Sequence, residues 1–166
     1  MSPSRIVSDC PITVLLLRHA ERAAVPADDQ PLTPAGIERA HPLVSVARNA
    51  GVRAIFTTQY VRSVQTAKPL AHHLRITPTV MVVDPADPEA YAQELVASIR
   101  SASQKTPVLV VSHTNTIPMI VAALGAAAIP PVSEAEFDKL FFIEAPNRSG
   151  RARIVQARYG APSAVV

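Results

Sequence analysis

Two histidines and two arginines stand at or just after the ends of short apolar runs of the sequence. They are Arg18, His19, Arg62 and His113. Neutral imidazole, whose unperturbed pKa is about 6.5, can attack phosphorus near neutral pH. Guanidinium groups hold phosphate oxygens through paired hydrogen bonds and a permanent positive charge. Together these residue types are suited to phosphoryl transfer, with fixed cations supplying the charge that a metal ion would otherwise supply.

The apolar runs before these residues predict strands that are buried on both faces. Residues 13–17 and 107–111 are continuous runs of this kind, and residues 53–58 form another. Ligands of open parallel sheets bind beyond the carboxyl ends of the strands. We therefore expect the two histidines and two arginines to converge on one pocket, although they are far apart in the sequence.

The rest of the sequence alternates between helical and strand patterns. Thr33-Pro34 combines a hydroxyl N-cap with proline at the first helical position, and this helix is expected to end before Gly51. Pro69 is expected to kink or shorten its helix. Further helices are expected over about 60–74, 89–103 and 115–124, and further strands over 79–83, 140–143 and 151–159. This order predicts a three-layer α/β/α sandwich with a mostly parallel central sheet.

Length and composition fit one domain with a substantial core. The chain has 166 residues, of which 48% are hydrophobic. Residues 1–11 are polar and contain proline, so we expect a flexible N-terminal arm before a single domain over residues 12–166.

The charge and hydropathy of the sequence indicate which binding partners and which cell compartment to expect. The net charge of +3 favours anionic ligands weakly, but the basic residues are scattered and aromatic residues make up only 4%, so neither nucleic-acid nor membrane binding is predicted. No run approaches the roughly 18 apolar residues of a membrane span, and no signal-peptide pattern is seen. The single cysteine, Cys10, cannot form an internal disulfide. A cytoplasmic protein is expected, although an exported form with a removed signal would fit the same sequence. No zinc-type ligand spacing is present, and no metal or cofactor is predicted.

Four segments, in order, resemble the histidine phosphatase superfamily, also called the phosphoglycerate-mutase-like family. The segments are Arg18-His19-Ala20-Glu21, Leu32-Thr33-Pro34-Ala35-Gly36, Thr58-Gln59-Tyr60-Val61-Arg62-Ser63-Val64-Gln65-Thr66-Ala67 and Val111-Ser112-His113. The resemblance covers about residues 13–125. It implies a phosphoglycerate-mutase-like fold and a small phosphatase that becomes phosphorylated on His19. Arg18, Arg62 and His113 would complete the phosphate pocket.

The resemblance also implies a carboxyl group that protonates the leaving oxygen and later activates water. The usual location is the loop after the third strand, where Asp84 stands first. Glu21, two residues after the nucleophile, is a competing candidate, and we favour Asp84 by a small margin.

Three further residues are predicted to contact the substrate. Arg22 occupies the second-arginine position of the acid phosphatase branch, although the proline expected two residues later is Ala24. Thr58 ends the second strand, and Asn115 stands at a helix start, where it would either cap the helix or face the substrate.

Short loops between the elements favour a compact, open site. Residues 23–32, 84–88 and 126–138 form these loops. Such a site suits a metal-independent phosphatase acting on protruding phosphates, either phosphate monoesters or phosphohistidine on proteins. The alternatives are a phosphate-binding or interaction module with degenerate catalysis, and a phosphoglycerate-type mutase. The predicted partner is thus a phosphorylated small molecule or phosphoprotein, and the oligomeric state is left open.

Overall fold

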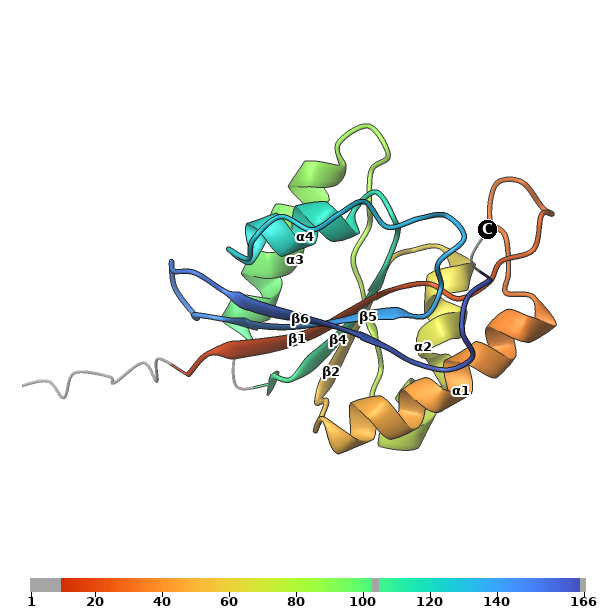
Figure 1. Ribbon diagram of the computed structural model, residues 1–166, viewed down its shortest axis with the longest axis horizontal. Coiled ribbons are helices and arrows are strands. Elements are labelled where there is room, and N and C mark those ends of the chain that lie inside the picture. The colour runs from red at the N-terminus through yellow and green to blue at the C-terminus, as the bar shows by residue number, and fades with distance from the viewer. Residues whose placement is uncertain (1–9, 103–104, 165–166) are drawn as a thin grey trace, which may run out of the picture.

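A six-stranded sheet forms the centre of the computed structural model, which describes residues 10–102 and 105–164 (Figure 1). Its strands are β1 (Ile12–Arg18), β2 (Ala54–Thr57), β3 (Thr79–Val80), β4 (Val108–Ser112), β5 (Lys139–Ala145) and β6 (Arg153–Arg158). They lie in the order β3-β2-β4-β1-β5-β6. The pairs among β3, β2, β4 and β1 are parallel, whereas β5 pairs antiparallel with both β1 and β6.

Two pairs of helices cover the two faces of this sheet (Figure 1). The helices are α1 (Pro34–Asn49), α2 (Val61–Leu74), α3 (Pro88–Ser101) and α4 (Ile117–Ala123). Side chains of α1 and α2 share one apolar cluster with the sheet, and side chains of α3 and α4 share the other. The predicted three-layer α/β/α sandwich with a mostly parallel sheet is therefore confirmed.

Strands β1 and β4 lie at the middle of the sheet because both of their faces are apolar. Leu15 and Leu17 of β1 pack on the α1/α2 side, while Val14 and Leu16 pack on the α3/α4 side. All five residues of β4 are buried. Arg18 is in register with Ser112 across this pair, so the segments that follow the two strands start side by side.

Helix boundaries follow from local sequence signals, with one exception. The Thr33 hydroxyl accepts a hydrogen bond from the Gly36 N–H at 3.1 Å, as the N-cap prediction required. Helix α1 ends before Gly51, whose φ of 77° is a left-handed conformation that glycine adopts freely. Pro69 was expected to kink or shorten its helix, and the shortening is wrong, since α2 continues through Pro69 to Leu74 as far as the predicted helix did. The flanking residues Ala67 and Leu70 are fully buried, and their packing offsets the hydrogen bond that proline removes.

Strand β3 is shorter than the sequence predicts. It ends at Val80 instead of residue 83. The Gln59 side chain explains the difference, because its amide accepts from the Val83 N–H at 3.0 Å and donates to the Val83 carbonyl at 2.9 Å. The backbone at Val83 is thus satisfied by a side chain rather than by a neighbouring strand.

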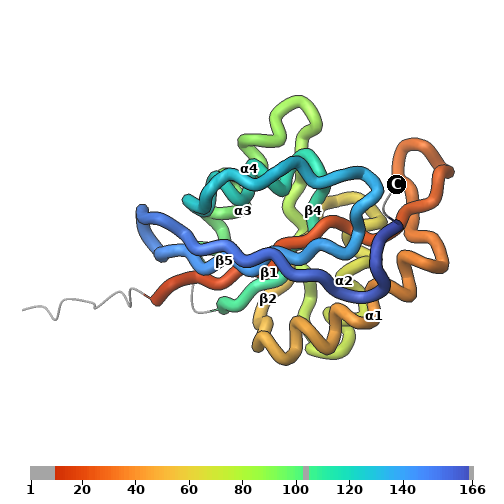
Figure 2. The backbone as a smooth tube through the Cα atoms, in the orientation of Figure 1, coloured from red at the N-terminus to blue at the C-terminus, as the bar shows by residue number. Residues whose placement is uncertain are grey.

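The chain after β6 bends away from the sheet toward the C-terminus (Figure 2). Arg39 of α1 donates to the carbonyl of Ala161 at 2.6 Å and so ties this segment to the helix. Residues 1–9 of the predicted N-terminal arm lie outside the described residues, and Cys10 is exposed. In the described part of the chain, no helix combines the length and apolar character needed to cross a membrane.

Candidate active site

His19 lies at the floor of a cavity of about 380 Å³ beyond the carboxyl end of β1. Its side chain is almost fully buried, and its backbone N–H donates to the Ser112 carbonyl at 3.0 Å. The ring Nδ1 lies 2.8 Å from the Ala20 carbonyl oxygen. A carbonyl can only accept, so Nδ1 carries the proton and Nε2, on the other side of the ring, keeps its lone pair.

Burial keeps this imidazole in its neutral, nucleophilic form. Desolvation lowers the pKa of His19 to about 2, and the charges of Arg18 and Arg62 push in the same direction. The Ala20 carbonyl opposes this effect but does not overcome it. The lone pair on Nε2 is therefore available throughout the physiological pH range.

His113 faces the same cavity from the end of β4, with its ring centroid 5.3 Å from that of His19. Its Nε2 lies 2.9 Å from the Thr58 hydroxyl, which itself donates to Ser63 at 2.8 Å. Since the single hydroxyl proton of Thr58 is used on Ser63, Nε2 of His113 is the donor in this contact. Burial first, and then the charges of nearby arginines, lower the pKa of His113 to about 3.

Arginine side chains supply the positive charge of the cavity, which Arg18, Arg22 and Arg62 all line. The Arg62 guanidinium stacks 4.3 Å from the Tyr60 ring centroid and lies 3.5 Å from the Gln30 side-chain oxygen. The Nε atoms of Arg18 and Arg62 are buried and have no hydrogen-bond partner among the described residues. Buried donors without partners beside two neutral histidines make a site that suits an anion such as phosphate. No group of three or more candidate metal-binding side chains occurs within residues 10–102 and 105–164.

Arg18 is held in place by a loop that the sequence did not connect with the site. Its Nη1 donates to the Glu134 carbonyl at 2.7 Å, and its Nη2 donates to the Glu134 carboxylate at 2.6 Å. The guanidinium also lies 4.1 Å from the Phe137 ring centroid. These contacts fix the plane of the guanidinium and bring a carboxylate to the rim of the cavity.

Two side chains of α2 accept hydrogen bonds from backbone groups near the cavity. The Thr66 hydroxyl accepts from the N–H of Ala20, the residue after His19, at 2.9 Å. The Gln65 side chain accepts at 2.7 Å from the N–H of Leu32, which forms a β-bridge with Arg22. Gln65 and Thr66 thus satisfy backbone donors that need acceptors.

Gly36 allows α1 to approach the same segment closely. A Cβ atom at this position would lie 2.2 Å from the Glu21 carbonyl oxygen, which is far inside van der Waals contact. That carbonyl also accepts from the Thr33 N–H at 2.9 Å. A side chain at position 36 would thus displace the backbone at Glu21, two residues after His19.

The structure does not bring the two predicted carboxylates into the cavity. The Glu21 carboxylate pairs with Arg39, with Nη2 to Oε1 at 2.6 Å, and Arg39 holds the pKa of Glu21 below its ordinary value despite partial burial. Asp84 is exposed, and its carboxylate accepts from the Ala86 N–H at 2.8 Å in a loop turn. Neither residue lines the cavity with His19.

The other predicted contacts are placed in different ways. Asn115 is exposed and lines the cavity, but it does not cap α4, which begins after Thr116. Thr58 lies behind His113 instead of lining the cavity. Sequence reasoning did not identify Tyr60, Asp28 and Glu134, which line the cavity. Tyr60 stood inside the segment quoted for the family resemblance, whereas Asp28 and Glu134 gave no signal beyond being acidic residues in loops.

Neutral buried histidines predict a pH-dependent stability. The pKa values of His19 and His113 are about 2 and about 3 in the folded chain, below the unfolded value near 6.5. The unfolded chain therefore binds more protons, and stability is fully present above pH 6.5 and is lost as the pH falls. Between pH 6.5 and 5, we expect the free energy of unfolding to fall by about 1 kcal/mol per pH unit per histidine.

Urea unfolding at several pH values, in a phosphate-free buffer, measures this slope. A chain with both His19→Asn and His113→Asn serves as the control and is expected to have a nearly flat profile over the same range. An equal slope in both proteins would contradict the assignment of neutral histidines.

A comparison with known protein families found a match for the segment that carries most of the residues lining the cavity. Residues 14–86, which include Arg18, His19 and Arg62, match the histidine phosphatase superfamily (branch 1). The matched segment is less than half of the chain, and over these residues the chain is similar to that superfamily. The match contains three of the four sequence segments that resemble this family and confirms the resemblance there, whereas Val111-Ser112-His113 lies outside the matched residues. A comparison with curated protein sequences found no match.

Solved structures with similar folds include proteins that are described as phosphatases. The protein histidine phosphatase SixA, complexed with tungstate, superposes with a TM-score of 0.66 at 19% identity, over 89% of this chain and 97% of that one. A putative phosphohistidine phosphatase SixA from Nakamurella multipartitia gives 0.62 at 23% identity, over 93% and 98%. A putative alpha-ribazole-5'-P phosphatase from Escherichia coli K-12 gives 0.64 at 15% identity, over 93% and 99%. These likenesses show a shared fold.

Proposed function

We propose that this protein hydrolyses phosphate monoesters, or phosphohistidine on proteins, through a covalent phosphohistidine on His19 and without a metal ion. The observation that supports this most is the 2.8 Å contact between Nδ1 of His19 and the Ala20 carbonyl. It keeps the proton on Nδ1 and the lone pair on Nε2, which is the atom that would attack phosphorus.

Binding of the phosphoryl group rests on the cationic floor of the cavity. Arg62 is held by its stacking on Tyr60, and its buried Nε is free to donate to a phosphate oxygen. Arg22 adds charge from the exposed side. The negative charge of the phosphate favours protonation of His113 at its second ring nitrogen, which then also donates to the phosphate.

The chemical step transfers the phosphoryl group to His19. The Nε2 lone pair forms a bond to phosphorus while the bond to the leaving oxygen breaks. Positive charge that develops on the imidazole is stabilised through Nδ1–H by the Ala20 carbonyl. Water then attacks phosphorus from the open side, and the electron pair of the P–N bond returns to Nε2. Guanidinium and imidazolium donors around the phosphorus supply the electrostatic stabilisation in both steps.

The shape of the site supports a substrate whose phosphate protrudes. The cavity is about 380 Å³ in volume, and exposed residues such as Asp28 and Asn115 line it. The structural alignments cover 97% and 98% of the two SixA chains, so this chain is close to them in size. One is described as a protein histidine phosphatase and the other as a putative phosphohistidine phosphatase, which favours a phosphorylated protein side chain among the substrates to test.

Turnover of an aryl phosphate in the presence and absence of EDTA, with glycerol added as a second acceptor, tests this proposal. We expect full activity with EDTA, because the arginines provide the charge. A shared phosphohistidine intermediate predicts that the ratio of glycerol phosphate to inorganic phosphate is the same for aryl phosphates with different leaving groups.

Loss of turnover with EDTA would contradict the metal-independent mechanism. A product ratio that changes with the leaving group would contradict the common intermediate. No hydrolysis across aryl, alkyl and phosphohistidine substrates would favour the degenerate phosphate-binding module instead.

A further inference from the structure

An acid for the leaving oxygen is needed in the proposed reaction, and neither carboxylate predicted for this role lies in the cavity. Glu21 is engaged by Arg39, and Asp84 caps a turn. Two other carboxylates of the described chain line the cavity, namely Asp28 and Glu134. The inference that follows rests on the proposed function, because it assigns a role within that reaction.

Glu134 is the carboxylate that the site itself holds in position. Its Oε2 accepts from Nη2 of Arg18 at 2.6 Å, and its Oε1 accepts from the Thr114 hydroxyl. Arg18 directly precedes the nucleophile, and Thr114 directly follows His113. The carboxylate of Glu134 is therefore linked to both segments that carry the histidines. Asp28 is exposed on the other loop, and its side chain makes no comparable contact with the described residues.

Glu134 lies on the exposed side of the cavity, which is the side from which the leaving group must depart. His19 and Arg18 are each only 3% exposed, whereas the side chain of Glu134 is 71% exposed. Attack by Nε2 from the floor requires the leaving oxygen to lie roughly in line on the opposite side of phosphorus, which is the open side. A carboxyl group at the rim can reach an oxygen there, whereas a group at the floor cannot.

We infer that Glu134 is the general acid, and then the general base, of this phosphatase. As Nε2 of His19 bonds to phosphorus, the P–O bond breaks and its electron pair stays on the leaving oxygen, which takes the proton of Glu134. The resulting carboxylate then accepts a proton from water as the water oxygen bonds to phosphorus. The P–N electron pair returns to Nε2, and Glu134 is protonated again.

Dependence on the leaving group tests this inference. The variant is Glu134→Gln, whose amide oxygen can still accept from Arg18 but which cannot donate an acidic proton. For a simple alkyl phosphate, we expect kcat/KM to fall by about 100-fold or more. For 2,4-dinitrophenyl phosphate, whose phenolate leaves without protonation, we expect less than about a fivefold change. The quantity kcat/KM reports only the steps up to leaving-group departure and so isolates the acid.

Matched variants separate the acid from other roles of a carboxylate. Asp28→Asn, also at the cavity, and Glu144→Gln, exposed on β5, are both expected to leave the ratio between the two substrates unchanged. Equal losses for both substrates in Glu134→Gln would mean that Glu134 only positions Arg18, and would overturn the inference. A gain in kcat/KM for both would mean that the carboxylate merely competes with phosphate, and would overturn it as well. A selective loss in Asp28→Asn alone would assign the role to Asp28 instead.

Failure here is distinguishable from failure of the proposed function. If phosphate is trapped on His19 but Glu134→Gln shows no leaving-group selectivity, the phosphatase proposal stands and the assignment of Glu134 falls. If no phosphohistidine forms in the parent chain, the proposed function itself falls.

Discussion

Replacing His19 by alanine is expected to lower kcat/KM for an aryl phosphate by at least about 10,000-fold. The reason is that the proposed route depends on one lone pair, that of Nε2 of His19, because this is the atom that forms the bond to phosphorus. Steady-state hydrolysis of the aryl phosphate by equal amounts of folded protein measures the effect.

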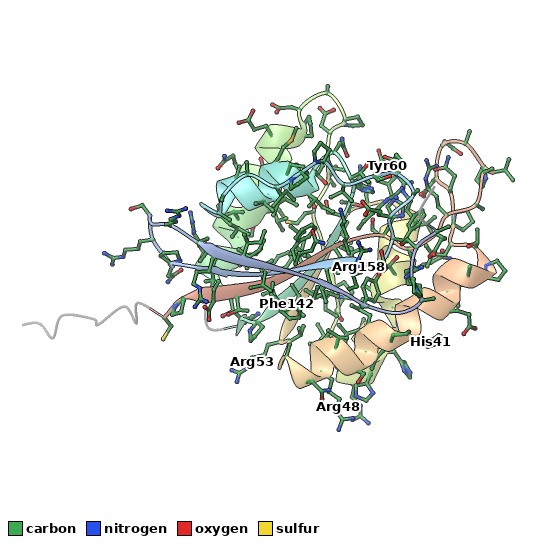
Figure 3. The ribbon with its side chains drawn as sticks, viewed as in Figure 1. His41, Arg48, Arg53, Tyr60, Phe142 and Arg158 are labelled. Atoms are coloured by element: carbon green, nitrogen blue, oxygen red, sulfur yellow. The ribbon has the colours of Figure 1, made fainter. Side chains whose placement is uncertain are left out.

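His41→Ala is the matched control for this variant. His41 is exposed on α1, and Figure 3 shows it on the outer side of that helix, away from Tyr60 of the cavity. This control is expected to keep the activity of the parent chain. Unfolding in urea establishes that both variants are folded at the assay temperature. Retention of more than a tenth of the activity by a folded His19→Ala protein would contradict a nucleophilic role.

Replacing Arg62 by alanine is expected to lower kcat/KM by about 100- to 1,000-fold, which is typical when one preorganised donor to a transition state is removed. The Arg62 guanidinium is oriented by its stacking on Tyr60, and its Nε is a buried donor without a partner in the described structure. Both features indicate a group prepared to bind the phosphoryl oxygens. The affinity for inorganic phosphate as a competitive inhibitor is expected to fall together with kcat/KM.

Arg62→Lys and Arg48→Ala are the two control variants for this prediction. Lysine keeps the charge but not the planar fork of donors, so Arg62→Lys is expected to recover only part of the lost activity. Arg48 is exposed near the end of α1, far from Tyr60 in Figure 3, and its replacement tests whether general loss of positive charge matters. Equal losses in Arg62→Ala and Arg48→Ala would contradict a specific phosphate contact.

Much of the fold could be predicted because the sequence encodes it locally. The central strands are apolar on both faces, and the first helix has its own cap at Thr33 and its own terminator at Gly51. The convergence of His19 and His113 followed from the rule for parallel strand ends, and the register of Arg18 with Ser112 brings it about. Strand β3 was overestimated because a side-chain amide, that of Gln59, takes the place of a strand partner.

The positions of the acidic side chains near the cavity could not be predicted from the sequence. Glu21 is two residues from His19, yet its carboxylate pairs with Arg39 of α1. Glu134 is more than a hundred positions away in the sequence, yet it contacts Arg18 directly. Proximity in the sequence does not determine which acidic side chain lies in a site. The ion pairs of the folded protein determine it. Only the three-dimensional arrangement could indicate Glu134.

Trapping the phosphorylated protein tests the central claim of a phosphohistidine on His19 most directly. The full chain is mixed with substrate carrying a radiolabelled phosphoryl group, quenched in alkali, digested and analysed by mass spectrometry, with His41→Ala as a positive control and His19→Ala as a blank. We predict a phosphoryl group on the peptide that contains His19, labile to acid and formed at least as fast as the substrate turns over. Turnover without this species, or a label found on another residue, would contradict the account.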